Sequence, residues 1–266
     1  MPEPAPEAPR AGIQSIEVAG RLLHALLEGG EALRLADLAR HAGMPSAKAH
    51  RYLVSLIRTG LATQNPATGR YDLGPLALRL GLHGIARFEP LRLAEQTIAA
   101  LSTQAGESAA LSVWAGRAPA IVRVAEARHS LAGQVPLGHA CPLTWSATGL
   151  VFAAFEPTAR TAPLLQEELR QNRRVARPGA PSTAAALETR LAAIRRAGVA
   201  VVDGAQGGAA AVAAPVHGAH GALAMVVTVF GPQGRLDATP EGPLARLVAE
   251  AATQLSALMG GPQLPG

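Results

Sequence analysis

The sequence has little cysteine and no long apolar run. Its 266 residues include a single Cys, Cys141, so no disulfide can form within the chain, as is usual in a reducing compartment. No apolar stretch approaches the roughly 20 residues that a membrane helix needs. Residues 1–12 are rich in Pro and Ala, without the cationic start and apolar run of a secretory signal. We therefore expect a cytoplasmic protein with no membrane partner and a disordered tail over residues 1–12.

Aromatic residues are also scarce. They make up 3% of the chain, whereas hydrophobic residues make up 48%, so any core must be packed mainly from Leu, Val and Ala. The length suits two domains. The formal net charge is +5, and Lys48 is the only lysine among 24 basic residues. Such an Arg bias can reflect genomic base composition, so it says little about function.

What the sequence does contain is a helix-turn-helix pattern between residues 34 and 74. The first helix carries apolar residues at i, i+3, i+4 and i+7, namely Leu35, Leu38, Ala39 and Ala42. Gly43 then suits a helix C-terminus, and Pro45 prevents the helix from continuing. Ser46 is the expected N-cap of the next helix.

Two further helices complete a small core. The helix from Ser46 to Thr59 repeats the apolar spacing with Ala49, Tyr52, Leu53 and Leu56. A preceding helix is expected from Ile16 to Leu27, ended by two glycines. Its expected inward residues are Ile16, Ala19, Leu23 and Leu26.

A β-hairpin follows these helices. Residues 61–64 and 70–73 read as strands, and residues 65–69 between them are turn formers that end in Gly69. A hairpin after such a helix is the wing of a winged helix. From Arg40 to Arg79 there are six Lys or Arg residues against one acid, Asp72, and such a face attracts phosphates. The alternative is a helical core domain with a solvated basic face.

Winged helices usually present the second helix of the motif to the DNA major groove. The side chains expected nearest to base edges or flanking phosphates are Ser46, Ala47, Lys48, His50 and Arg51. Ser55 lies on the same side, and Arg58 and Arg70 are expected to contact the DNA backbone. One winged helix covers too few base pairs for selectivity in a genome, so the chain is expected to form at least a dimer.

Several motifs together resemble one known family. They are Ser15-Ile16-Glu17, LADLARHAGMP, KAHRYLVSLIRTGL, TGRYDLGP, PLTWSATG at 142–149, RRAGVAV at 195–201 and AAPV at 213–216 with Gly221 after it. Their order and spacing, from about residue 13 to 260, resemble the IclR-type bacterial transcriptional regulators. None of these motifs is decisive alone, but their ordered combination is specific.

The resemblance implies an α+β fold with three parts. These are an N-terminal winged helix-turn-helix over 13–74, a linker helix over 75–88 and a C-terminal GAF-like mixed α/β domain over 89–260 for effector binding and oligomerisation. It also implies a homodimer or homotetramer on a palindromic double-stranded DNA operator, acting as repressor or activator. A small-molecule effector would modulate operator binding. An alternative is a C-terminal domain that only dimerises and senses nothing.

The effector site is expected where a helix begins in the second half. Ser146, Ala147, Thr148 and Gly149 start that helix, and its free N–H groups and positive dipole end favour an anion such as a carboxylate. The resemblance adds Asp203 and Thr228 to this site, although Asp203 would repel a carboxylate unless it faces another ligand group or points away. On a purely structural interpretation, Ser146 is only an N-cap and Thr228 only a strand former. A strand is also expected over residues 131–135.

Enzyme and metal alternatives are weak. Cys141 lies beside His139, which could activate a thiolate, but side chains at i and i+2 rarely approach each other well. His217 and His220 flank a predicted turn, and no Cys/His cluster accompanies them in the sequence. A Walker loop and a GxGxxG dinucleotide site are both absent. We therefore expect no enzyme activity, no cofactor and no metal.

Overall fold

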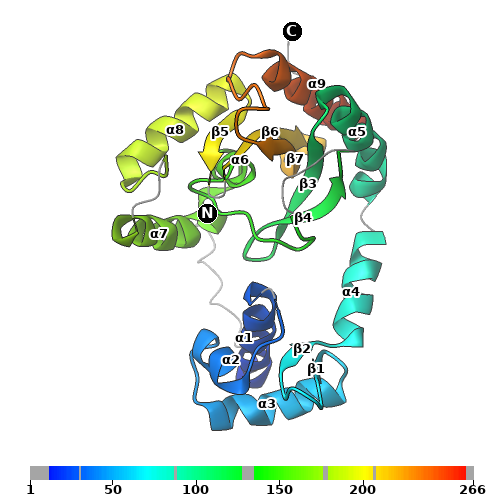
Figure 1. Cartoon of the computed structure of the whole chain (residues 1–266), viewed down its shortest axis with the longest axis vertical. Coiled ribbons are helices and arrows are strands. Elements are labelled where there is room, and N and C mark those ends of the chain that lie inside the picture. The colour runs from blue at the N-terminus through cyan, green and yellow to red at the C-terminus, as the bar shows by residue number, and fades with distance from the viewer. Residues whose placement is uncertain are drawn as a thin grey trace, which may run out of the picture. The chain divides into compact units, whose positions relative to one another are not determined.

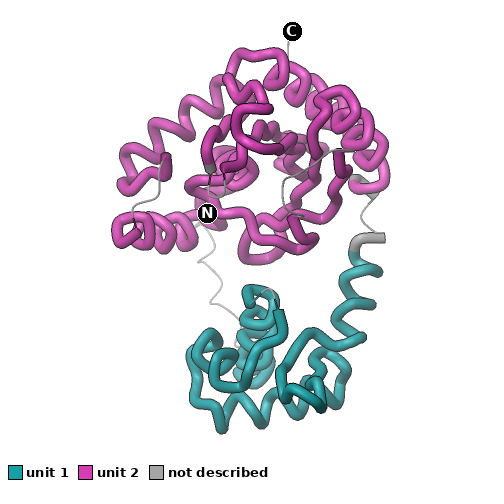
Figure 2. Tube along the Cα trace, viewed as in Figure 1, with its two compact units in different colours: residues 1–87 teal, residues 88–266 magenta. Residues whose placement is uncertain are grey.

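The computed structural model describes residues 12–29, 31–86, 89–127, 135–175, 179–205 and 208–261. The chain divides into two compact units, residues 1–87 and residues 88–266 (Figure 2). Almost all of the expected tail over 1–12 and of the expected strand over 131–135 lies outside the described residues. Within the described residues, no helix combines the length and the apolarity that a membrane crossing requires.

Unit 1 contains a three-helix core followed by a two-stranded hairpin and a further helix. Its elements are α1 (Gln14–Glu28), α2 (Leu35–His41), α3 (Ser46–Arg58), β1 (Ala62–Gln64), β2 (Tyr71–Leu73) and α4 (Pro75–Ala86). Leu22, Leu38 and Leu53, one from each of the first three helices, are fully buried in a shared core. Gly43 has a φ of +63°, the left-handed conformation that lets α2 end and the chain turn towards α3. The winged helix-turn-helix expectation is therefore confirmed.

Two details of this unit were predicted wrongly. Ile16 is 68% exposed, whereas the predicted Leu26 is buried and Ala19 and Leu23 pack partly against the core. The fully buried residues of α1 are Val18, Leu22, Ala25 and Leu26. Ser46 is the first residue of α3 and not its cap, because Pro45 occupies the cap position in an extended conformation. The Pro45 carbonyl already accepts the amide hydrogens of Lys48 and Ala49, so α3 begins without a side-chain cap.

Unit 2 is built on one antiparallel sheet with the strand order β4-β3-β7-β6-β5 (Figure 1). Its strands are β3 (Ser108–Ala115), β4 (Ala118–Ala125), β5 (Ala200–Ala205), β6 (Ala209–His217) and β7 (Leu223–Pro232). Its helices are α5 (Glu89–Ala105), α6 (Ala147–Phe155), α7 (Thr158–Arg174), α8 (Ala184–Ala197) and α9 (Pro243–Leu258), with a short 3-10 turn η1 (Ala219–Gly221). This arrangement agrees with the GAF-like α/β expectation.

Helices cover both faces of this sheet. Thr228 on β7 pairs with Ala110 on β3 and with Ala213 on β6, so these three side chains share one face. Helix α6 packs against β5, β6 and β7 on that face, where Ala213 and Val226 belong to a core shared with it. Helices α5 and α9 pack against β3 and β6 and cover the opposite face. The strands are consequently rich in Ala and Val on both faces.

Candidate nucleic-acid interface and ligand site

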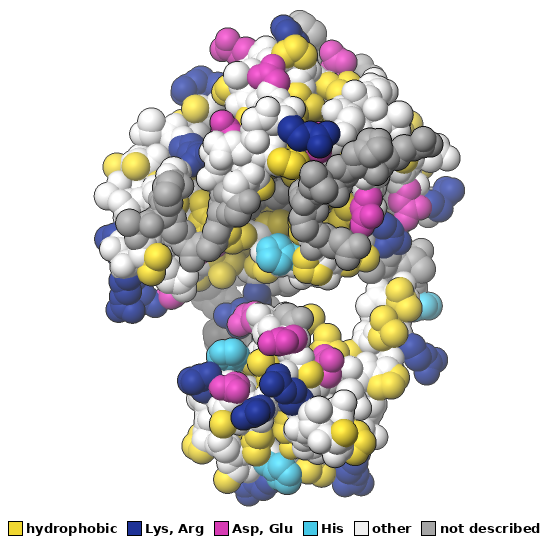
Figure 3. Space-filling model, viewed as in Figure 1, with side chains coloured by type: hydrophobic (Ala, Val, Ile, Leu, Met, Phe, Trp, Pro, Cys, Tyr) yellow, Lys and Arg dark blue, Asp and Glu magenta, His cyan; other side chains and the backbone are white. Residues whose placement is uncertain are grey.

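The outward face of α3 is the first candidate site. It consists of the exposed residues Ala47, His50, Arg51, Val54, Ser55 and Arg58. In the space-filling view, Lys, Arg and His side chains line the edge of unit 1 that α3 forms, with hydrophobic side chains between them (Figure 3). Ser46 is also exposed, and Lys48 is half-buried. Within the described part of the chain, no carboxylate pairs with Arg51 or Arg58, so both guanidinium groups are available for phosphates or bases.

Two residues predicted for this interface, Arg70 and Ser55, also donate hydrogen bonds to backbone carbonyls of unit 1. The Arg70 guanidinium donates to the carbonyl of Ala32 at 2.9 Å, and it is half-buried. It therefore attaches β2 to the segment that precedes α2, beside the main-chain bridge between Leu33 and Tyr71. The Ser55 hydroxyl donates to the Arg51 carbonyl at 3.4 Å along α3. Part of the donor capacity of each side chain is thus used inside unit 1.

The start of α6 is held tightly by its own cap. Ser146 Oγ accepts from the Gly149 amide at 2.9 Å and donates to the Pro142 carbonyl at 2.7 Å. A Cβ on Gly149 would lie 1.9 Å from the Pro142 oxygen, so only glycine allows this close approach. Ser146 is thus an N-cap, and the structural alternative describes it correctly. Among the described residues, the amide groups of Ala147 and Thr148 make no hydrogen bond outside the helix, so they remain as donors at this helix end.

Thr148 and Thr228, which the sequence assigned to one site, meet in the core of unit 2. Their Oγ1 atoms are 2.7 Å apart, and both side chains are buried. Ser112 on β3 lies two residues from Ala110, the partner of Thr228, and therefore on the same sheet face. Its hydroxyl is fully buried and makes no hydrogen bond of normal geometry with the described residues. We refer to Ser112, Thr148 and Thr228 as the hydroxyl cluster.

Sequence reasoning missed Ser112. It stands within the apolar strand SAALSVWA, where a serine is commonly a neutral filler. The only feature that could have pointed to Ser112 is that it shares a sheet face with Thr228, which was expected to contact the ligand. That signal required the strand register, which the sequence does not give.

Cys141 borders the hydroxyl cluster as an inert thiol. Burial raises the pKa of Cys141 to about 11, against a smaller opposite effect of the neighbouring Ser112 and Thr148 hydroxyls. The thiol lies 4.0 Å from the His139 carbonyl, and the His139 side chain is exposed. A protonated thiol is a poor nucleophile, so this geometry does not support the catalytic Cys–His alternative.

Asp203 stands apart from the hydroxyl cluster. It is exposed on β5, the edge strand, where the pairing with β6 is irregular between Val202 and Ala205. Within the described residues, no hydrogen bond or ion pair joins Asp203 to Thr148, Thr228 or Ser112. The structure thus brings two of the expected ligand residues together and leaves Asp203 on the surface.

A carboxylate on α7 fixes the segment that leads into α6. Glu168 accepts from the amides of Leu143 and Thr144, each at 2.9 Å, and from the Thr144 hydroxyl at 2.7 Å. Asn172, one turn further along α7, donates to Thr144 Oγ1 and to the Pro181 carbonyl, each at 3.0 Å. This Glu168 clamp positions the helix start that carries Thr148. No pattern in the sequence indicates this clamp, because a Glu on an amphipathic helix is normally solvated.

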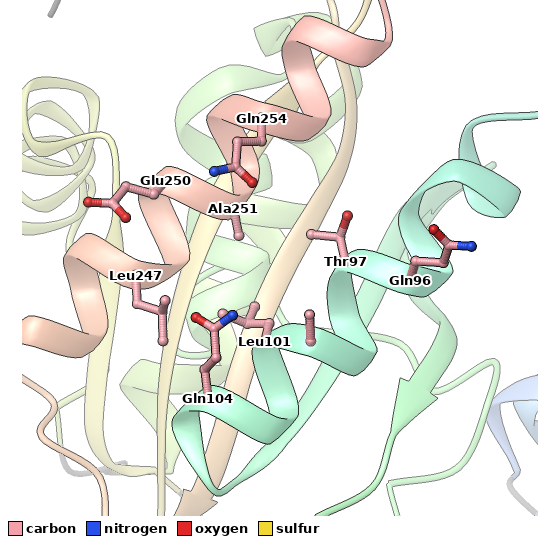
Figure 4. A pocket seen from close by; sticks show the side chains of 9 residues that line it. Gln96, Thr97, Leu101, Gln104, Leu247, Glu250, Ala251 and Gln254 are labelled. Atoms are coloured by element: carbon pink, nitrogen blue, oxygen red, sulfur yellow. The ribbon is translucent and has the colours of Figure 1, made fainter.

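Hollows are found elsewhere in unit 2, and those described below are not lined by Ser112, Thr148 or Thr228. A groove of about 300 Å³ runs between α5 and α9 and is lined largely by amide, hydroxyl and carboxylate side chains, among them Gln96, Gln104 and Gln254 (Figure 4). A second hollow of about 260 Å³ lies beside His217, whose ring packs edge-on against Phe155 at 5.6 Å. His220 is exposed, and no cluster of three metal-ligating side chains occurs within the described residues.

The chain is similar to known regulators over almost its whole length. The family described as "Bacterial transcriptional regulator IclR C-terminal" matches residues 85–257, and the "IclR helix-turn-helix domain" matches residues 15–66. The "Glycerol operon regulatory protein" of Streptomyces griseus is 32% identical over 251 residues, which cover 93% of this chain and 97% of that relative. These relatives are transcriptional regulators and not enzymes.

Solved structures agree with this match. The crystal structure of Pseudomonas aeruginosa HmgR is 36% identical with a TM-score of 0.60, and the match covers 95% of this chain and 100% of that one. An IclR homologue from Microbacterium hydrocarbonoxydans, solved in complex with 4-hydroxybenzoate, shares the fold at 21% identity with a TM-score of 0.68. That match covers 91% of this chain and 98% of the other.

Proposed function

Because the chain belongs to the IclR family of DNA-binding transcriptional regulators, we propose that α3 reads its operator and that a small metabolite at the hydroxyl cluster modulates this binding. The metabolite is a carboxylate-bearing molecule. The protein acts as a homodimer or homotetramer on double-stranded DNA. The single observation that carries the effector site is the buried Thr148–Thr228 contact beside the Ser112 hydroxyl, which makes no hydrogen bond of normal geometry with the described residues.

The DNA-binding surface is supported by the unpaired cations of the outward face of α3. Arg51 lies within the first two turns of the helix, the part that docks most closely to base edges in helix-turn-helix proteins. Arg58, at the last turn, and Arg70, beside the wing, lie where backbone phosphates would flank the helix. Lys48, His50 and Ser55 complete the polar surface around Arg51.

The experiment for this surface is footprinting followed by substitution. Protection mapping upstream of the protein's own gene or a neighbouring gene first defines the operator. Arg51→Ala is then expected to weaken specific binding by about 1–3 kcal/mol if Arg51 reads a base. Unchanged operator affinity of the folded variant would overturn the assignment of Arg51.

The ligand site is supported by the buried Ser112 hydroxyl, which makes no hydrogen bond of normal geometry with the described residues and whose polar neighbour there is the Cys141 thiol. A buried hydroxyl without a hydrogen bond costs free energy, so Ser112 is suited to a ligand or a water that supplies one. The three hydroxyls carry no charge, and the positive end of α6 with the Ala147 and Thr148 amides is the local feature that favours an anion. The homologue solved with 4-hydroxybenzoate provides a precedent for a small carboxylate within this fold.

The experiment for the ligand site is calorimetry with two panels of small molecules, carboxylates and polyols such as glycerol. A carboxylate is expected to bind, with an affinity that falls in Thr148→Val and Thr228→Val. Binding by polyols alone would overturn the anion assignment, and binders that ignore both substitutions would show that the site is misplaced.

A domain that only oligomerises is the competing function of unit 2. An effector shifts operator binding only if it binds the two operator-binding states with different affinities. We therefore expect the operator affinity to change when the binder found by calorimetry is added at saturation. If neither panel contains a binder, the oligomerisation-only function is favoured.

A further inference from the structure

One residue of α3 departs from the polar character of its surface. At 100° per residue, Ala47, Arg51, Val54 and Arg58 fall on one line, at i, i+4, i+7 and i+11. This line lies opposite the buried residues Ala49, Leu53 and Leu56. Val54 is 44% exposed, although it occupies the middle of the surface that we assign to DNA.

Packing within unit 1 does not account for Val54. The core of this unit takes Leu53 and Leu56 from α3 as buried residues, with Tyr52 and Ile57 packed partly against them. Val54 is not part of that core. A single exposed valine is ordinary on a protein surface, so its exposure alone indicates no function. The position of Val54 on α3 is what suggests a contact. Here it stands between Arg51 and Arg58, two cations without carboxylate partners in the described structure.

The major groove offers one apolar group among its base edges. Guanine, cytosine and adenine present only hydrogen-bond donors and acceptors there, whereas thymine adds a C5-methyl group. A valine side chain pressed against the polar edges would bury donors or acceptors without a partner, which costs affinity. Against a thymine methyl it buries apolar surface on both sides, which favours binding.

We propose that Val54, together with Ala47, reads thymine methyl groups, so that each operator half-site presents A·T pairs to the middle of α3. This inference rests on the proposed role of α3 and adds a base preference to it. Arg51, which lies between Ala47 and Val54 on this line, and Arg58, which follows Val54, supply the contacts to polar base edges and phosphates. The occupant of this surface is therefore a DNA segment with thymines inside the protected half-site.

The test removes the methyl groups one at a time from the DNA. Each thymine of the footprinted operator is replaced by deoxyuridine, which keeps the base pairing and deletes only the C5-methyl. Wild-type affinity is expected to fall about fourfold at one or two positions in each half-site, the loss that corresponds to one buried methyl group. In Val54→Ala the same replacement at the Val54 position is expected to have almost no effect, because the two changes remove one shared contact.

Two further variants make the test specific. Val54→Thr keeps the side-chain shape while replacing one methyl with a hydroxyl, so it is expected to reduce the uracil effect even if Val54→Ala perturbs the helix. Leu27→Ala removes another exposed apolar side chain of unit 1, on α1, and is expected to retain the full uracil effect.

The outcomes separate this inference from the function on which it rests. If Arg51→Ala leaves operator affinity unchanged, α3 is not the reading helix and the proposed interface fails. If Arg51→Ala weakens binding but uracil has no effect, or has the same effect in wild type and in both Val54 variants, the methyl contact is wrong. A Val54→Ala protein that binds the operator normally but loses self-association would assign Val54 to a protein contact instead.

Discussion

A hydroxyl in the core of unit 2 contributes much more to the free energy of unfolding than a hydroxyl on a helix surface. Thr148 and Thr228 share one buried hydrogen bond, so removing either hydroxyl leaves the other without its partner. We expect Thr148→Val and Thr228→Val each to lower the free energy of unfolding by about 1–3 kcal/mol, and the double variant to lose less than the sum. Urea unfolding measures all three.

Thr103 supplies the matched control for this pair. It lies exposed on α5, and its hydroxyl donates to the Ala99 carbonyl of the same helix. Thr103→Val is expected to change stability by less than about 0.5 kcal/mol. Additive losses in the double variant would contradict a direct Thr148–Thr228 bond.

The Cys141 thiol makes stability depend on pH. Burial raises its folded pKa from 9.0 to about 11, so between these values the unfolded state binds fewer protons than the folded state. The stabilising contribution is complete below pH 9 and is lost as the pH rises towards 11. Wild type should therefore lose about 1 kcal/mol more than Cys141→Ala between pH 8 and pH 10. Parallel losses in denaturant titrations of both proteins would show that the thiol does not titrate in this way.

At the scale of elements, the Glu168 clamp joins α7 to the segment before α6. Glu168→Gln replaces a carboxylate oxygen by an amide group that cannot accept, so a buried N–H of Leu143 or Thr144 loses its partner. We expect a loss of about 1–3 kcal/mol in the free energy of unfolding and weaker binding at the hydroxyl cluster. Glu167→Gln on the same helix alters only the exposed contacts to Arg170 and Gln171. Equal effects of the two substitutions would remove the special role of Glu168.

Helices, strands and turns were predicted best where the spacing of residues is compatible with only one local structure. Gly43 and Pro45 mark the turn between α2 and α3, and the hairpin loop follows from its turn residues. Ile16 was wrongly placed on the inward face of α1 because two apolar stripes fit the same helical period, one through Ile16 and one through Val18, whereas the expected Leu26 is buried. Packing against α2 and α3 selects between them, and that selection involves contacts distant in sequence.

In the ligand site, too, the residues that belong to a local sequence pattern were predicted, and those whose role depends on contacts distant in sequence were not. Ser146 and Thr148 were found because a helix start has a local pattern, and the structure gives Ser146 the role of cap. Ser112 and Glu168 were missed because their meaning depends on pairings across the sheet and between α7 and the loop. Sequence spacing contains neither of these pairings.

For the whole molecule, the exposed apolar surface of α4 requires a partner. Leu78, Leu80 and Leu82 are 64%, 58% and 58% exposed, on a helix that carries no acid. A helix that is apolar on several sides is stable in water when another surface covers it. A second copy of the chain could provide that surface, and a palindromic operator also requires two winged helices. We therefore expect light scattering to give at least twice the single-chain mass of 27.2 kDa at micromolar concentration.

Substitution on α4 tests whether this helix holds the copies together. Leu78 and Leu82 lie one turn apart on the same side, so Leu78→Glu with Leu82→Glu places charges in the proposed contact. This double variant should shift towards the single-chain mass and bind the full operator at least tenfold more weakly, because each half-site would then be bound alone. Glu substitutions at Ile13 and Leu27, which are exposed near the two ends of α1, provide the control and should keep the wild-type mass. A wild-type protein of single-chain mass with full operator affinity would contradict the dimer. A double α4 variant that keeps the wild-type mass would place the contact on another surface.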